Sequence, residues 1–231
     1  MKNKFKLALL MFCLIFLLTG CSSTNKNNGK TIKDKTDSEL SYVEDTIFTI
    51  INKYAKDEYM KDGRIEWDNI KNDSKKINNA LDTILLDLSE LDIPNDDLIS
   101  FSNELNNLII LISKEDDILA IDKLNHLYSL IPKYMARYSD DKNKISKKEL
   151  KSNILASYNF SNAKKWAEAK ATIQTVEDKY KTMMNDVDYM RENTYNLNKV
   201  YVLIEELKNA INMENMELIK MKYVNLIEEI N

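Results

Sequence analysis

Few residues of this chain have side chains suited to chemistry, and the first pair lies on one predicted helix. His126 is the only histidine, and Asp122 precedes it by one helical turn. An imidazole and a carboxylate on one helix face can bind a metal ion or move a proton. This pair alone leaves most of a metal's coordination sphere unfilled, since the next positions on that face are Ser129 and Leu130. We therefore interpret His126 as a structural or surface histidine, and we predict no metal site.

Aromatic side chains form the second set of candidates. Trp67 and Trp166 are the only two tryptophans, and each falls at the start of a predicted long helix, a short distance after Tyr59 and Tyr158 respectively. Such rings can stack on a ligand, but they serve equally as packing anchors between helices. We favour packing, and we keep these four residues, with His126 and Asp122, as the candidate binding residues.

The sequence supports no other catalytic chemistry. Cys13 and Cys21 are the only cysteines, and neither lies in the predicted helical body. With three glycines in the whole chain, there is no glycine-rich phosphate loop. Paired carboxylates such as Glu205 and Glu206 are adjacent in sequence, so on a helix they point about 100° apart and form no catalytic dyad. The sequence predicts a protein that is not an enzyme and takes no cofactor.

The charge balance of the chain is acidic. It holds 33 Lys and Arg against 37 Asp and Glu, a net charge of −4. Residues 1–20 contribute three lysines and no acid, so the remainder carries −7. Because like charges repel, an acidic body is poorly suited to phosphate backbones. We expect no nucleic-acid partner.

The scarcity of glycine and proline, together with apolar residues recurring every three or four positions, predicts long helices. We expect eight of them, at about 38–60, 67–91, 96–112, 116–138, 146–160, 164–191, 194–211 and 214–231. Asp62-Gly63 should end the first, and Pro132 should kink or end the fourth. Ser113–Asp116 and Ser146–Glu149 fit capping boxes at two helix starts.

A shift of 99 residues aligns one half of the chain with the other without a gap. The shift superimposes Trp67 on Trp166, Tyr59 on Tyr158 and Lys71 on Lys170. The predicted helix breaks also coincide, although amphipathic periodicity alone produces some coincidence. We interpret the chain as an all-α protein of two tandem four-helix units, residues 38–138 and 139–231, arising by internal duplication. The sequence leaves open whether the units are separate domains or share one core.

The first residues have the layout of an export signal. Three lysines precede an apolar run from Leu7 to Leu18, which is too short to span a bilayer, and Leu18-Thr19-Gly20-Cys21 follows. This segment resembles a bacterial lipoprotein signal peptide with its lipobox. The resemblance implies removal of residues 1–20 and attachment of lipid to Cys21, which holds the protein on the membrane. The polar stretch 22–37 is predicted to be a flexible tether.

The body also resembles uncharacterised all-helical lipoproteins of low-GC Gram-positive bacteria. The matching residues are Leu124–Tyr128 with Ile131-Pro132, then Trp166, then Lys222–Leu226. No activity follows from this resemblance, which supports only a helical fold and an extracytoplasmic location at the cell membrane. We expect a lipid-anchored binding or adapter module for a cell-envelope protein. The alternative is a lipoprotein that captures a solute or metal in the groove between the two units.

Overall fold

The computed structural model describes residues 25–193 and 196–230, which form nine helices and one small hairpin. The prediction of an all-α protein is confirmed. The helices are α2 (Asn25–Ala55), α3 (Trp67–Glu90), α4 (Asn95–Ser113), α5 (Asp117–Tyr138), α6 (Lys142–Asn162), α7 (Trp166–Met184), α8 (Val187–Asn193), α9 (Leu197–Asn212) and α10 (Met216–Ile230). The hairpin pairs β1 (Met60–Lys61) with β2 (Arg64–Ile65).

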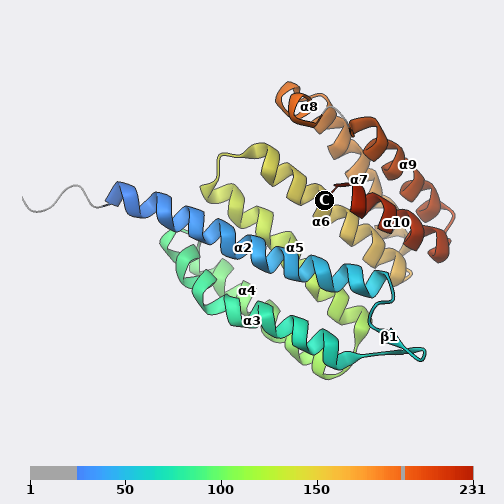
Figure 1. Cartoon of the computed structure of the whole chain (residues 1–231), viewed down its shortest axis with the longest axis horizontal. Coiled ribbons are helices and arrows are strands. Elements are labelled where there is room, and N and C mark those ends of the chain that lie inside the picture. Colours follow the sequence, from blue (N-terminus) through green and yellow to red (C-terminus); the bar gives the residue numbers. More distant parts are fainter. Residues whose placement is uncertain (1–24, 194–195, 231) are drawn as a thin grey trace, which may run out of the picture.

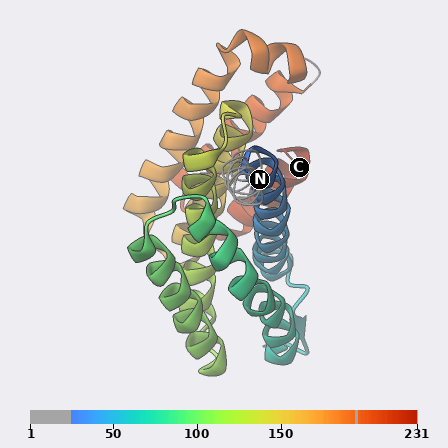
Figure 2. The same ribbon diagram turned by 90° about the vertical axis from the view of Figure 1, so that its left-hand side faces the viewer.

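The helices pack as two groups of four that meet along a common layer. Helices α2, α3, α4 and α5 contact one another in sequence order, and α5 returns to α2; α6, α7, α9 and α10 repeat this arrangement. Between the groups, α5 packs on α6 and α10 touches α2. Four helices, α2, α5, α6 and α10, therefore form a closed central ring. Figures 1 and 2 show α3 and α4 on one side of this ring and α7, α8 and α9 on the other.

Both groups share one hydrophobic core. The buried apolar residues form a single continuous cluster that draws on the central ring and on both outer helix pairs. The apolar residues expected to face inward on the first helix are buried except for Tyr54, which is half-buried, and those expected along residues 96–112 are all buried. The buried ones are Leu40, Val43, Ile47, Ile50, Ile51, Leu98, Phe101, Leu105, Leu108 and Ile112. The question that the sequence left open is thereby answered in favour of one core.

The predicted flexible tether is wrong for residues 25–37, which belong to helix α2. Thr36 is completely buried, and Asp37 accepts hydrogen bonds from Tyr138 and Lys144. The polar composition of this stretch suggested coil because it holds almost no apolar residues. Tertiary contacts with the ends of α5 and α6 stabilise the helix instead.

Both predicted capping boxes are wrong. Ser113 belongs to the end of α4, where its hydroxyl donates to the Ile110 carbonyl, and the cap of α5 is Asp116, which accepts from the Leu119 amide at 3.1 Å. Helix α6 begins four residues before Ser146, because Asp141 caps it by accepting from the Lys144 amide at 2.9 Å. Aspartate is as good a cap as serine, so composition alone did not decide the start.

Two predicted helices also end differently. The first stops at Ala55, and Asp62 and Gly63 (φ of 51° and 75°) form the turn of the β1–β2 hairpin, a conformation that Asp-Gly favours. The segment 164–191 is broken after Met184, and Asp186 caps α8 by accepting from the Tyr189 amide. Pro132, by contrast, lies inside α5 without ending it.

Candidate functional site

His126 and Asp122 lie in different environments on α5. His126 is exposed on α5, while Asp122 is half-buried and accepts a 3.0 Å hydrogen bond from the Asn159 side chain on α6. Among residues 25–193 and 196–230, no group of three or more histidine, cysteine, aspartate or glutamate side chains is arranged to hold a metal ion. Asp122 therefore acts as a contact between α5 and α6.

Tyr59 lies beside α3, where it anchors a small charged cluster. Its hydroxyl donates to Asp73 at 2.8 Å, and the Lys53 ammonium lies 3.0 Å from the same carboxylate. Burial raises the pKa of Tyr59, and the hydrogen bond to Asp73 raises it further. Burial also opposes ionisation of Asp73, but hydrogen bonds from Lys76, Lys53 and Tyr59 outweigh it and lower the pKa of Asp73 to about 2. The cluster fixes the end of α2 to α3.

Trp67 and Trp166 occupy equivalent positions in the two helix groups. Each is the first residue of its helix, α3 or α7, and each is half-buried against the shared core. Neither lines the pocket described below. Both side chains pack against the core, and their role as anchors between helices stays a prediction.

Tyr158 lies in the central ring and not with the other candidates. Its ring stacks on Tyr223 of α10, with centroids 4.3 Å apart and planes inclined by 23°. The Tyr223 hydroxyl donates to the Asn52 side chain of α2 at 2.6 Å. The six sequence candidates thus lie in several separate contacts and do not form one site.

A buried polar network crosses the central ring, and the sequence analysis missed it. Glu44 of α2 accepts a 2.7 Å hydrogen bond from the Tyr128 hydroxyl of α5, and it forms an ion pair with Lys148 of α6. Glu44 is 5% exposed. Burial and the Glu44 charge raise the pKa of Tyr128. The sequence does contain an indication of this network, because Glu44 falls one turn after Leu40, among the apolar residues that recur along α2.

Lys151 lies one turn beyond Lys148 on the same helix. Its ammonium is 5.5 Å from the centroid of the Phe48 ring on α2, a cation–π distance. Burial lowers the pKa of Lys151, although the Glu44 charge opposes this shift. The network links α2, α5 and α6.

A second buried acid lies between α7 and α9. Glu177 accepts ion pairs from Lys181 and Lys208, and Gln174 donates to it at 3.0 Å. The hydrogen bonds from Lys181 and Lys208 lower the pKa of Glu177 to about 2. Its side chain is 5% exposed, so these partners replace the water it has lost.

We expect acid to destabilise the protein through Glu177. A carboxyl whose folded pKa is depressed stabilises the fold above its unfolded pKa, and this contribution disappears as the pH falls toward the folded value. Glu177→Gln should therefore lower the free energy of unfolding by about 2 kcal/mol at pH 7 and hardly at all near pH 2. Urea denaturation at several pH values between 7 and 2 measures this. Glu168→Gln, at an exposed position of α7, is the control. An unchanged pH dependence in Glu177→Gln would contradict the assignment.

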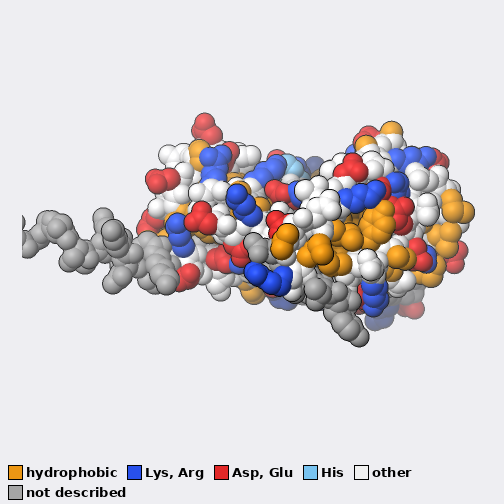
Figure 3. All heavy atoms as spheres, turned by 90° about the horizontal axis from the view of Figure 1, so that it is seen from above, with side chains coloured by type: hydrophobic (Ala, Val, Ile, Leu, Met, Phe, Trp, Pro, Cys, Tyr) orange, Lys and Arg blue, Asp and Glu red, His pale blue; other side chains and the backbone are white. Residues whose placement is uncertain are grey.

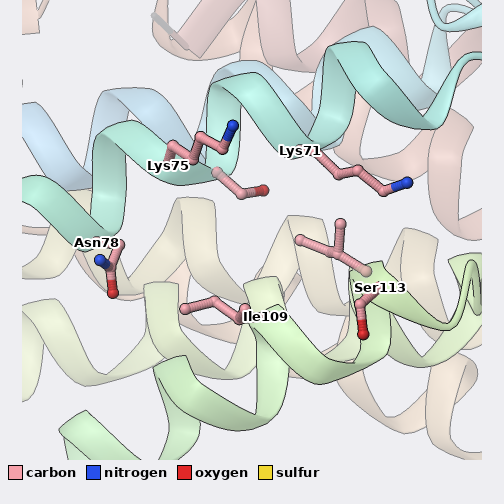
Figure 4. Close-up of a pocket in the computed structure, with 7 residues that line it drawn as sticks. Lys71, Lys75, Asn78, Ile109 and Ser113 are labelled. Atoms are coloured by element: carbon pink, nitrogen blue, oxygen red, sulfur yellow. The ribbon is translucent and has the colours of Figure 1, made fainter.

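A pocket opens between α3 and α4, on the outer side of the first helix group (Figure 4). Its volume is about 320 Å³. The lining residues are Lys71, Ser74, Lys75 and Asn78 of α3 with Ile109, Ile112 and Ser113 of α4. None of the six candidate residues lines it, and it does not lie in the groove between the two units. Sequence reasoning missed it, although Lys71 and Lys75 are spaced by one helical turn.

Known protein families, curated proteins and solved structures gave no match to this chain. Within the described part of the chain, no helix combines the length and apolar character needed to cross a bilayer. The proposed lipidation site, Cys21, lies outside the described residues.

Proposed function

We propose that the protein is a lipid-anchored binding module on the extracytoplasmic face of the cell membrane. One observation carries the proposal: the lipobox cysteine Cys21 stands four positions before Asn25, the first residue of a helix that continues into the core. Because buried Thr36 and the contacts of Asp37 secure this helix to the body, lipid on Cys21 holds the helical body close to the head groups.

The binding half of the proposal rests on the exposed surface. Hydrophobic side chains gather on the face that is uppermost in Figure 1, the face on which α8 lies (Figure 3). On α8, Val187 is 76% exposed and Met190 is 43% exposed. Exposed apolar side chains grouped on one face suit a protein partner. We propose a cell-envelope protein as that partner.

The internal duplication is also part of this proposal, and matched contacts support it. The ion pair of Lys71 with Glu115 at 3.4 Å recurs 99 residues later as Lys170 with Glu214 at 2.7 Å. The caps of α5 and α10 recur in the same way, since Asp116 accepts from the Leu119 amide, and Asn215 from the Leu218 amide, each at 3.1 Å. A duplicated four-helix unit explains why the contacts repeat at one offset.

Replacing Cys21 with serine tests the anchor and the partner in one experiment. We expect Cys21→Ser to lose all incorporation of labelled fatty acid, because serine supplies no thiol for the lipid. Cys13→Ser is the matched control and should incorporate label like the wild type. Cross-linking on intact cells should give an adduct with an envelope protein in the wild type. Label retained by Cys21→Ser would contradict the anchor, whereas a labelled wild type without any adduct would contradict the partner alone.

A second candidate function is capture of a small solute, and the α3–α4 pocket is the observation that favours it. Capture would use this pocket and not the groove between the units.

A further inference from the structure

We propose that the α3–α4 pocket binds a small amphipathic anion, a single acyl chain that carries a carboxylate or phosphate head. This inference concerns a site within the first helix group and does not depend on the lipid anchor or on a protein partner.

The rim of the pocket on α3 is positively charged (Figure 4). Lys71 is partly neutralised by Glu115 at 3.4 Å and Asp68 at 3.8 Å. Lys75 is exposed and has no acidic partner among the described residues, so its charge is available to a ligand. In an otherwise acidic protein, this favours an anion at the rim.

The floor of the pocket is apolar with one polar exception. Ile112 is buried and Ile109 faces the opening from α4, and the methylene stems of the two lysines extend the apolar surface. Ser74 is 4% exposed, and its hydroxyl has no hydrogen-bond partner among the described residues. A buried hydroxyl without a partner costs free energy, which a ligand oxygen would recover.

The equivalent place in the second helix group holds a buried ion pair. Ninety-nine residues after Asn78 and Ile109 stand Glu177 and Lys208, which form the buried ion pair between α7 and α9. At the position of Ser74 the second group has Ile173, which is also buried. At the three matching positions the first group has the uncharged Ser74, Asn78 and Ile109, which line the pocket.

The size of the pocket limits the size of the ligand. Its volume of about 320 Å³ lies at the lower end of ligand pockets, which span about 300–1,000 Å³. A pocket of this size suits one short acyl chain. Decanoate is such a chain and carries the required charge.

Titration calorimetry with decanoate tests the proposal. The protein is the chain from Ser22 to Asn231, which contains every helix and core contact described above, and circular dichroism checks that each variant is folded. We expect saturable decanoate binding and at least tenfold weaker binding of decyltrimethylammonium, a cation of equal chain length. Lys75→Gln should weaken decanoate binding about tenfold, which corresponds to about 1.4 kcal/mol.

A second variant, called the closing variant, tests the pocket by filling it instead of removing a charge. Asn78→Glu with Ile109→Lys copies the Glu177–Lys208 pair into the pocket and should abolish decanoate binding. The matched control is Asn79→Glu with Ile110→Lys, which makes the same changes one residue along each helix, outside the lining, and should bind like the wild type. Decanoyl lysophosphatidate forms a second arm: its affinity relative to decanoate distinguishes a lipid phosphate from a free fatty acid as the source of the anion.

Three results would overturn the proposal. The first is absence of saturable binding of both anions to the wild type. The second is equal affinity for decanoate and decyltrimethylammonium. The third is an equal effect of the closing variant and its control, whether both bind or both fail, because the pocket would then not be the site.

Discussion

Tyr223→Ala is expected to lower the free energy of unfolding by about 4 kcal/mol. The side chain is completely buried at the centre of the ring of α2, α5, α6 and α10. Its ring stacks on Tyr158 of α6, and its hydroxyl donates to Asn52 of α2. Alanine would leave a cavity between the two helix groups and an unpaired amide oxygen on α2, and the costs of the two defects add.

Urea denaturation measures this loss, with Tyr223→Phe as the matched control. Phenylalanine retains the stacked ring and loses only the hydrogen bond, so we expect a cost of about 1 kcal/mol. When Trp166 is replaced by phenylalanine, the fluorescence of Trp67 reports on the first helix group. When Trp67 is replaced instead, the fluorescence of Trp166 reports on the second group. Since both groups share one core, the two fluorescence transitions should coincide. Separate midpoints, or a cost of Tyr223→Ala as small as that of Tyr223→Phe, would contradict a shared core that depends on Tyr223.

Lys148→Ala is expected to cost about 3 kcal/mol, the second largest effect. The side chains of Lys148 and Glu44 are 12% and 6% exposed, so the ion pair between α6 and α2 is shielded from water. Removing the lysine leaves the Glu44 carboxylate buried without its ion pair, although the Tyr128 hydroxyl still donates to it. An uncompensated buried charge is far more destabilising than the loss of an exposed ion pair.

The double variant Glu44→Leu with Lys148→Met separates the two contributions. It replaces both charges with apolar side chains and should recover most of the stability lost in Lys148→Ala. Lys142→Ala, at an exposed position of the same helix, is the control and should change stability by less than about 0.5 kcal/mol. If the double variant were as unstable as Lys148→Ala, the cost would come from packing and not from the unpaired carboxylate.

The helices were predictable to a large extent because their apolar stripes are strong. The stripe from Leu40 to Ile51 and the stripe from Leu98 to Ile112 are both buried as expected. Helix ends were less predictable, since Asp116 and Asp141 cap where serines were expected. At these ends several residues can cap equally well, and the tertiary contacts of the neighbouring turn decide between them.

The candidate binding residues were harder to place. The proposed duplication pairs Tyr59 with Tyr158, yet Tyr59 bonds to Asp73 and Tyr158 stacks on Tyr223. Their partners lie on different helices, and a single sequence does not reveal which helix faces meet. The pocket could not be predicted for the same reason. The spacing of Lys71 and Lys75 can be read from the sequence, but the position of Ile109 opposite them cannot.

The sequence by itself determined the helical class, because its apolar residues repeat with the helical period and helix-breaking residues are scarce. The proposed lipobox and the proposed offset of 99 residues also rest on the sequence alone, because they are local or periodic patterns. Only the tertiary structure decided that α2 extends back to Asn25, that both groups share one core, and that Glu44 pairs with Lys148. These features depend on contacts between residues far apart in the chain, whose free energies are set by packing and burial and not by local preference.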